Sequence, residues 1–221
     1  MEDDQQGVQG VLQAHRQALI GAARRGQSGT SSEPSLVTLV PPRSVAACAR
    51  FVGDRKAVGQ MSAVEVVEAD LSRPEHESAT AELVDLYARD PMGDGAPLSA
   101  EVRARLIPGL REHPTTLVFL AFSDGEPVGL AVCFLGFSTF AAKPLINIHD
   151  FFVTSSCRGL GVGRQLLEAV AEKGRALGCC KLTLEVLENN HPARGLYAAS
   201  GFAQVTYQPE AGGAIFMSKV L

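Results

Sequence analysis

A glycine-rich segment in the last third of the chain could bind an anion: Arg158-Gly159-Leu160-Gly161-Val162-Gly163-Arg164. It follows an apolar stretch that predicts a strand ending at Val153 and precedes a stretch that predicts a helix. Glycine permits tight, positive-φ turns that bring backbone N–H groups close to a ligand, and a helix N-terminus carries a partial positive charge. The segment is therefore a candidate site for a phosphate or pyrophosphate group, although glycines also serve plain turns.

Two common phosphate-binding patterns do not fit this spacing. In a Walker loop the last glycine is followed by Lys and then by Ser or Thr, whereas Gly163 is followed by Arg164 and Gln165. The dinucleotide-binding pattern places its third glycine where Arg164 stands, and it belongs near the start of its domain. The pattern that remains is Arg-x-x-Gly-x-Gly, filled by Arg158, Gly161 and Gly163.

This pattern resembles the loop with which the GNAT acetyltransferases hold the pyrophosphate of coenzyme A. Two flanking segments extend the resemblance. Asp150-Phe-Phe-Val153 is similar to the strand that precedes the family's loop, and residues 190–202, from Asn190 through Tyr197 to Gly201-Phe202, resemble its Asn…Tyr…Gly-Phe segment. The resemblance covers about residues 116–207, and the run from Ile148 to Gly163 is especially similar to the diamine (spermidine/spermine) acetyltransferases.

The resemblance implies a fold, a co-substrate and an acceptor. The fold is the α/β GNAT fold, a mixed, mostly antiparallel twisted sheet of about seven strands flanked by helices. The co-substrate is acetyl-CoA, with no metal, and the acceptor is a primary amine of a small molecule, polyamine-like, an amino acid or another amine. Backbone N–H groups of Phe151, Phe152 and Val153 are implied to contact the pantetheine and the thioester oxygen, and residues 158–164 the pyrophosphate. A homodimer is implied too, because the family is commonly dimeric.

Acetyl transfer needs a donor that protonates the departing thiolate, and Tyr197 is the candidate. The resemblance matches it with the family tyrosine that serves the coenzyme A sulfur, whereas by itself a tyrosine before a Gly-Phe turn is typical of core packing. Asn190 and Ala193 are candidate contacts of the coenzyme arm on the same resemblance. Asn190, which stands two residues before Pro192, also has the position of a helix N-cap.

The base is where the chain departs from the diamine enzymes, which carry a glutamate at the position of His149. A histidine, with an ordinary pKa of about 6.5, can accept the amine's proton directly or through water, so His149 is the candidate base. The plainer interpretation is a strand histidine that is hydrogen-bonded at the sheet surface. The missing carboxylate weakens the case for a polycation and leaves Asp150 and Glu185, with Asp90 and Asp94, as possible acidic contacts for the acceptor.

Hydrophobic periodicity predicts a mixed sheet with helices on its faces to position these residues. Asp124-Gly-Glu126 predicts a tight turn between two antiparallel strands. Strands are predicted over Val64–Val67, Thr116–Ser123, Pro127–Phe137, Leu145–Val153, Lys181–Leu187, Ala203–Tyr207 and Ala214–Val220, and helices over Glu75–Arg89, from Ser99 to Pro114, from Val162 to Leu177 and from Pro192 to Tyr197. The first 60 residues lack a coherent period and are predicted to form a loosely ordered extension, which places the acetyltransferase domain at residues 61–221.

Composition narrows the function classes. The 221 residues carry a formal net charge of −4, and residues 61–221 alone hold 13 Lys or Arg against 19 Asp or Glu, so a nucleic-acid partner is not expected. No apolar run reaches the roughly 18 to 20 residues that span a bilayer, and the five cysteines show no metal-binding spacing and are interpreted as reduced thiols. No membrane association and a cytoplasmic location are therefore expected. Three alternatives stay open: a non-catalytic CoA-binding regulator, an acetyltransferase acting on a protein amino group, and an unrelated nucleotide-binding module.

Overall fold

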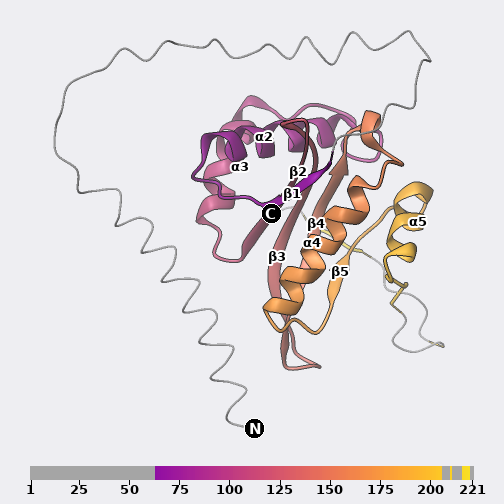
Figure 1. Cartoon of the computed structure of the whole chain (residues 1–221). Coiled ribbons are helices and arrows are strands. Elements are labelled where there is room, and N and C mark those ends of the chain that lie inside the picture. Colours follow the sequence, from indigo (N-terminus) through magenta and orange to yellow (C-terminus); the bar gives the residue numbers. More distant parts are fainter. Residues whose placement is uncertain (1–62, 206–209, 211–215, 220–221) are drawn as a thin grey trace, which may run out of the picture. The chain divides into compact units, whose positions relative to one another are not determined.

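The computed structural model describes residues 63–205, 210 and 216–219 (Figure 1), and the predicted extension, residues 1–60, lies outside them. Five strands form one sheet in the order β1-β2-β3-β4-β5. They are β1 (Glu65–Glu68), β2 (Thr116–Ser123), β3 (Glu126–Ser138), β4 (Lys143–Val153) and β5 (Leu182–Leu184). The first three pairings are antiparallel and the pairing of β4 with β5 is parallel, which confirms the predicted mixed, mostly antiparallel sheet.

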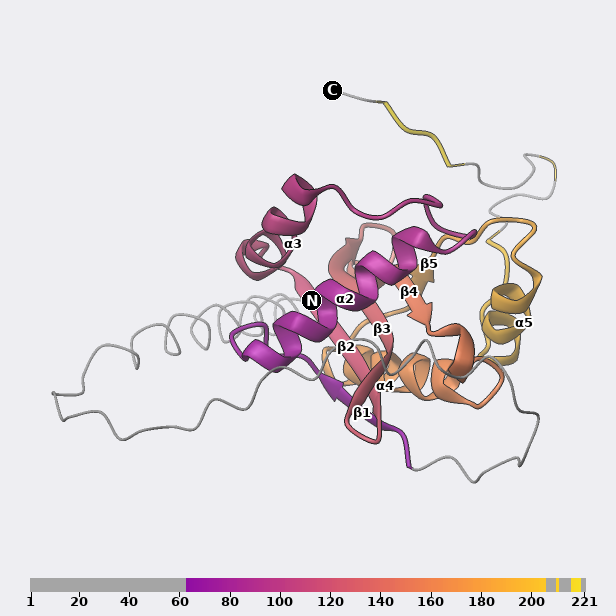
Figure 2. The same ribbon diagram turned by 90° about the horizontal axis from the view of Figure 1, so that it is seen from above.

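Four helices and one short turn complete the described fold. They are α2 (Pro74–Arg89), α3 (Ala100–Glu112), α4 (Val162–Ala176), α5 (His191–Ala199) and the 3₁₀ turn η2 (Ser155–Cys157). The helices α2 and α4 cover opposite faces of the sheet (Figure 2). The apolar stripe predicted for α4 packs against one face of the sheet, and its residues Val162, Leu166 and Val170 are fully buried. The sequence pattern therefore located both helical layers correctly.

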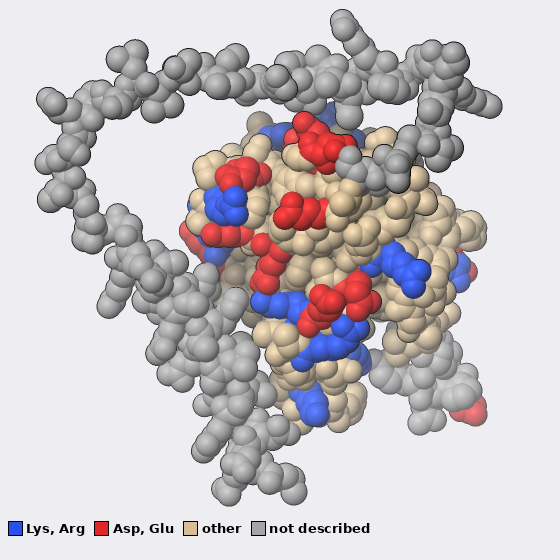
Figure 3. Space-filling model, viewed as in Figure 1, with Lys and Arg blue, Asp and Glu red and all other residues tan. Residues whose placement is uncertain are grey.

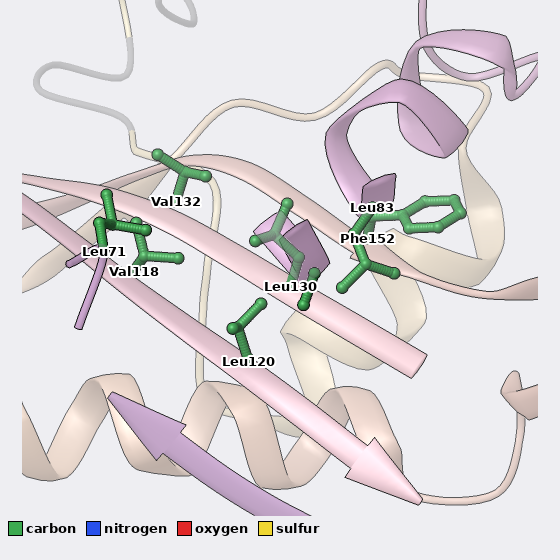
Figure 4. Packing of buried hydrophobic residues seen from close by; sticks show 8 residues of the cluster. Leu71, Leu83, Val118, Leu120, Leu130, Val132 and Phe152 are labelled. Atoms are coloured by element: carbon green, nitrogen blue, oxygen red, sulfur yellow. The ribbon is translucent and has the colours of Figure 1, made fainter. Parts of the chain in front are cut away.

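The core between α2 and the sheet determines which way the residues of β4 point. Phe152 is 7% exposed and lies beside Leu83 of α2, near Leu130 of β3 (Figure 4). Because side chains alternate along a strand, its neighbour Phe151 points to the opposite face, where α4 and α5 lie. The two phenylalanines of the Asp-Phe-Phe-Val run therefore anchor β4 from both sides.

The turn between β2 and β3 is the predicted hairpin. Ser123 pairs with Glu126, so Asp124 and Gly125 form a two-residue connection. Both have positive φ angles, 53° and 78°, as a type I′ turn requires, and Asp-Gly is a preferred pair for that turn. The prediction from Asp124-Gly-Glu126 is confirmed.

The end of the chain differs from the prediction in two ways. The strand expected over Lys181–Leu187 is shorter, because β5 ends at Leu184. The strands expected over residues 203–207 and 214–220 lie partly outside the described residues, and their described parts, residues 203–205 and 216–219, have no regular secondary structure. Apolar residues continue past Leu184 in the sequence. Their pattern does not indicate where pairing with the neighbouring strand ends.

The described surface adds two observations. On the face shown in Figure 3, basic and acidic side chains lie side by side. The ion pairs of the described residues include Lys173–Glu68 at 2.8 Å and Arg175–Glu168 at 2.9 Å. That face has no continuous basic patch of the kind that an extended phosphate backbone favours. Among the described residues, no helix combines the length and the apolar character that a membrane crossing requires.

A buried carboxylate fixes the segment between α2 and α3. Asp85 is 5% exposed and accepts hydrogen bonds from the Nε of Arg89 at 2.8 Å and the backbone N–H of Leu98 at 3.0 Å. The Nη2 of Arg103 lies 2.6 Å from Oδ1, the oxygen that also accepts from Leu98, whereas Arg89 donates to Oδ2. Burial raises the pKa of Asp85, but these hydrogen bonds outweigh burial and hold that pKa below its ordinary value.

We expect Asp85→Asn to lower the free energy of unfolding by about 1 to 3 kcal/mol, because a charge-assisted network loses its anion. Urea unfolding measures the change, with the exposed pair Glu101–Arg105 as the control, since Glu101→Gln should change stability by less than about 0.5 kcal/mol. The depressed pKa means that the contribution of Asp85 is fully present above its ordinary pKa of 3.8 and is lost as the pH falls through the folded-state value. Equal stability of wild type and Asp85→Asn at neutral pH would contradict this assignment.

Candidate active site

Halfway along its length, β4 loses its partner on one side. Residues Ile146–Ile148 pair with β5, which ends at Leu184, whereas the pairing with β3 continues to Val153. Between Ile148 and Asp150 the register with β3 shifts by one residue, so that His149 is the extra residue of a β-bulge. In the described part of the chain, the second half of β4 therefore presents an edge that no strand covers.

The hydrogen-bond pattern with β3 decides which backbone groups reach this open edge. The N–H of Thr154, directly after β4, donates to the carbonyl oxygen of Val128 at 2.9 Å. Hydrogen-bonded pairs alternate along an antiparallel ladder, so Phe152 directs its N–H toward β3. Phe151 and Val153 then direct their N–H and C=O groups toward the open edge. Two of the three residues predicted to contact the thioester arm have N–H groups available for it.

The glycine loop leads from this edge into α4. Gly159 and Gly161 have φ angles of 77° and 88°, and Gly161 is the N-cap residue of α4. As glycine it offers no capping side chain, and the first turn of α4 contains no Asp or Glu. No carboxylate of α4 therefore offsets the partial positive charge at the N-terminus of this helix. Such a terminus favours an anion. Leu160 on the loop and Arg164 in the first turn of α4 are exposed, whereas Val162, the first residue of α4, is buried.

Gly163 allows α4 to approach β4 and α5 closely. A Cβ atom at this position would lie 2.8 Å from the Cδ2 of Leu196 and 3.5 Å from the ring of Phe151. The third glycine of the motif therefore brings the loop, the open strand and α5 together.

We expect Gly161→Ala to raise the Kd for acetyl-CoA about tenfold, because a left-handed φ costs a residue with a Cβ about 1 to 2 kcal/mol and shifts the loop. Isothermal calorimetry measures the Kd. Gly109→Ala in α3 is the matched control, since Gly109 has no left-handed φ and open space around its Cβ position. An unchanged Kd in Gly161→Ala would show that the conformation of Gly161 is not needed for the ligand.

Tyr197 of α5 lies against the open half of β4. It is 7% exposed, and its ring meets the ring of Phe151 edge to face with 5.8 Å between centroids. Burial raises the pKa of its hydroxyl to about 12, and the neighbouring phenol of Tyr87 adds to the rise. The hydroxyl is therefore protonated at neutral pH and can act as a proton donor.

Tyr87 is a site residue that the sequence did not identify, because its spacing on α2 is that of an ordinary core position. Its ring lies 5.8 Å from the ring of Phe152. Burial raises the pKa of its hydroxyl, and the negative charges of Asp150, Asp90 and Asp94 raise it further. The signal that could have found Tyr87 is its place in the last turn of α2, directly before the acidic loop at Asp90.

Asp150 and His149 occupy the bulge on the α2 side of β4. The carboxyl of Asp150 is half-buried, and burial raises its pKa while the charge of His149 lowers it by less. His149 is exposed, and its ring lies 5.5 Å from the ring of Phe134, edge to face. Glu185 is exposed directly after β5. The structure therefore brings Asp150, but not Glu185, next to Tyr87.

Asn190 is the N-cap residue of α5. Its Oδ1 accepts a hydrogen bond from the N–H of Ala193 at 3.3 Å. The side-chain oxygen of Asn190 therefore acts as the helix N-cap, and the N–H of Ala193 donates to that oxygen. The Nδ2 group of Asn190 is the part of this pair that can donate to a ligand.

Arg158 begins the motif, yet its side chain turns back onto the protein. Its Nε donates to the carbonyl oxygen of Val153 at 2.9 Å, and its Nη2 lies 2.6 Å from the Oδ2 of Asp90. Its guanidinium carbon lies 5.6 Å from the centroid of the Phe152 ring. The side chain of Arg158 therefore joins the glycine loop to the end of α2.

Comparisons with known proteins identify a family. The acetyltransferase (GNAT) family model matches residues 80–202. The uncharacterized N-acetyltransferase YhfO of Bacillus subtilis is 30% identical over 107 residues, which are 48% of this chain and 68% of YhfO. Thialysine N-epsilon-acetyltransferase of Bos taurus is 34% identical over 89 residues, which are 38% of this chain and 52% of the bovine protein.

A solved structure extends the comparison to the fold. The aminoglycoside N-acetyltransferase AAC(6')-Iy in complex with CoA is 20% identical and superposes with a TM-score of 0.56, over 74% of this chain and 99% of that one. The shared architecture and the family match over more than half of the chain lead to one conclusion. This chain belongs to the GNAT family of acyl-CoA-dependent acetyltransferases.

Proposed function

We propose that the chain transfers the acetyl group of acetyl-CoA to a primary amine of a small molecule. The observation that carries this proposal is the open edge of β4 beyond Ile148, which runs from the bulge at His149 to the glycine loop and has Tyr197 beside it. A strand edge, an anion site at one end and a buried proton donor fit the pantetheine arm, the pyrophosphate and the thioester sulfur of acetyl-CoA.

The residues present fit acetyl-CoA in detail. The amide groups of a pantetheine arm can pair with the C=O group of Phe151 and the N–H of Val153, as an added strand would, which leaves the N–H of Phe151 for the thioester oxygen. The N-terminus of α4, with Gly159 and Gly161 in positive-φ conformations, suits the pyrophosphate. Among the described residues, no three His, Cys, Asp or Glu side chains gather as a metal site would require, and the proposed chemistry does not call for one.

In the reaction, the amine nitrogen forms a bond to the thioester carbon, the carbon–sulfur bond breaks, and the amine loses a proton while the thiolate gains one. The N–H of Phe151 is positioned to stabilise the negative charge that develops on the carbonyl oxygen. The Tyr197 hydroxyl donates a proton to the leaving thiolate. His149, exposed on the bulge, accepts the amine's proton directly or through water.

The acceptor class follows from the groups on the α2 side of β4. The half-buried carboxyl of Asp150 and the acids around Tyr87 favour a cationic amine over a neutral or anionic acceptor. The bovine relative is named for an amine acceptor, thialysine, and the resemblance to the diamine acetyltransferases supports the same class. A homodimer and a cytoplasmic location stay predictions.

The test is the thermal stability of the purified chain with acetyl-CoA, CoA, ATP or NAD. A ligand that binds only the folded state raises the midpoint, by an amount equivalent to about 2.7 kcal/mol at a hundred times its Kd. We expect a rise with acetyl-CoA and CoA and none with ATP or NAD. No rise with either form of CoA would contradict the proposal, and a rise with ATP or NAD alone would favour a nucleotide-binding module.

A further inference from the structure

The guanidinium of Arg158 contacts three residues from two elements, β4 and the C-terminal end of α2. It donates to the carbonyl oxygen of Val153 at the end of β4, pairs with Asp90 at the end of α2, and lies against the ring of Phe152 from the sheet. Val153 directs its carbonyl toward the open edge of β4, so Arg158 closes that edge at the loop end. A planar guanidinium can serve two acceptors at fixed angles, which a lysine ammonium cannot match.

The side chain of Asp90 is largely buried and uses both carboxylate oxygens. Its side chain is only 13% exposed, against 48% for Arg158. One carboxylate oxygen accepts the N–H of Met92 at 2.9 Å and the other faces Arg158. Burial raises the pKa of Asp90, but the bonds from Arg158 and Met92 outweigh burial and lower it overall, so the carboxylate stays charged for the pairing at neutral pH.

The backbone of Asp90 ties this contact to the acceptor side of the site. Its N–H donates to the carbonyl oxygen of Tyr87 at 3.0 Å at the end of α2. The chain then folds back so closely that a Cβ on Gly93 would clash with the same carbonyl oxygen. A shift of Asp90 would therefore move Tyr87 as well.

We propose that Asp90 is a positioning residue that, through Arg158, holds the end of β4 and the glycine loop against the C-terminus of α2. The inference rests on the proposed function, because the pair would align the acetyl-CoA edge at Phe151 and Val153 with the acceptor side at Tyr87 and Asp150. We call this contact between Asp90 and Arg158 the tie. In this assignment the Arg158 side chain forms the tie, and the backbone of the loop binds the pyrophosphate. If Arg158 were instead a phosphate ligand, it would have to leave Asp90 when acetyl-CoA binds.

A double-mutant cycle of Asp90→Asn and Arg158→Gln distinguishes the two roles. The tie predicts that each single variant and the double variant lower kcat/KM for the amine by a similar factor, about tenfold, with the Kd for acetyl-CoA within about threefold of wild type. Arg158→Lys should resemble Arg158→Gln. A phosphate ligand predicts that Arg158→Gln alone raises the Kd for acetyl-CoA about tenfold or more, that Arg158→Lys retains affinity, and that Asp90→Asn does not weaken it. That pattern, or losses that multiply in the double variant, would overturn the tie.

Amide hydrogen exchange of the ligand-free protein tests the tie without relying on activity. We expect Asp90→Asn to speed exchange in residues 153–161 and Arg158→Gln to speed it in residues 87–93, since each variant releases the other segment. Arg175→Gln, which breaks the exposed pair with Glu168, is the control and should leave both segments unchanged. Faster exchange confined to the mutated segment would overturn the tie. Failure of the wild type to bind acetyl-CoA would instead reject the proposed function, and hydrogen exchange would still decide on the tie.

Discussion

Replacing Tyr197 by phenylalanine is expected to lower kcat about a hundredfold or more, because loss of a general acid removes that order of rate enhancement. The Kd for acetyl-CoA should stay within about threefold of wild type, since the ring that packs against Phe151 is retained. Steady-state kinetics and calorimetry on the same preparation measure the two quantities. A kcat close to that of wild type would remove Tyr197 from the chemistry.

Tyr87→Phe is the matched comparison, because it removes the other phenol near the site. It should raise KM for the amine more than it lowers kcat, since Tyr87 lies with the acidic groups of the acceptor side. The pH profile adds a further check. Because burial raises the pKa of Tyr197 to about 12, this hydroxyl should not produce a falling limb in kcat below about pH 11.

Asp150→Asn is expected to lower kcat/KM for a cationic amine by about ten- to a hundredfold, because it removes the half-buried negative charge next to Tyr87. The effect should be mainly in KM for the amine, and the Kd for acetyl-CoA should not change. Initial rates with a diamine and with an uncharged amine of similar size measure the selectivity. Equal losses with both amines would contradict a charge-recognition role.

The same variant is expected to be more stable than wild type at neutral pH. The folded-state pKa of Asp150 is raised by burial, so the folded protein binds this proton more readily than the unfolded chain. Stability is therefore lost as the pH rises from the ordinary carboxyl pKa through the raised value, and asparagine does not incur that loss. Urea unfolding at several pH values should show the advantage of Asp150→Asn at neutral pH and its disappearance in acid. Lower stability of the variant at neutral pH would contradict the assignment.

The sequence predicted the layers of the fold because their signals are local. The Asp124-Gly125 turn, the apolar stripe of α4 and the run at Phe151-Phe152 each depend on residues within one or two turns or along one strand. The glycine loop was recognisable for the same reason, since its positive-φ residues and the helix that follows are adjacent in the chain.

The parts that could not be predicted depend on contacts between distant segments. The strand β5 ends at Leu184, opposite Ile148 and directly before the bulge of β4 at His149, and no pattern within residues 181–187 indicates where that bulge lies. The contact of the Arg158 side chain with Asp90, 68 residues earlier in the chain, could not be predicted from the motif, and the cofactor contact of Arg158 stays a prediction. The effect of the Asp150 charge on the pKa of Tyr87 likewise joins residues that are far apart in the chain. Helical or strand periodicity does not predict contacts between such distant residues.

Release of free thiol from acetyl-CoA in the presence of a panel of small amines tests the account most directly, with wild type and Tyr197→Phe compared side by side. The account predicts thiol release that requires an added cationic amine, yields the N-acetylated amine by mass spectrometry, and falls about a hundredfold or more in Tyr197→Phe. Thiol release that is independent of every amine tested, or no release from a protein that binds acetyl-CoA, would contradict it.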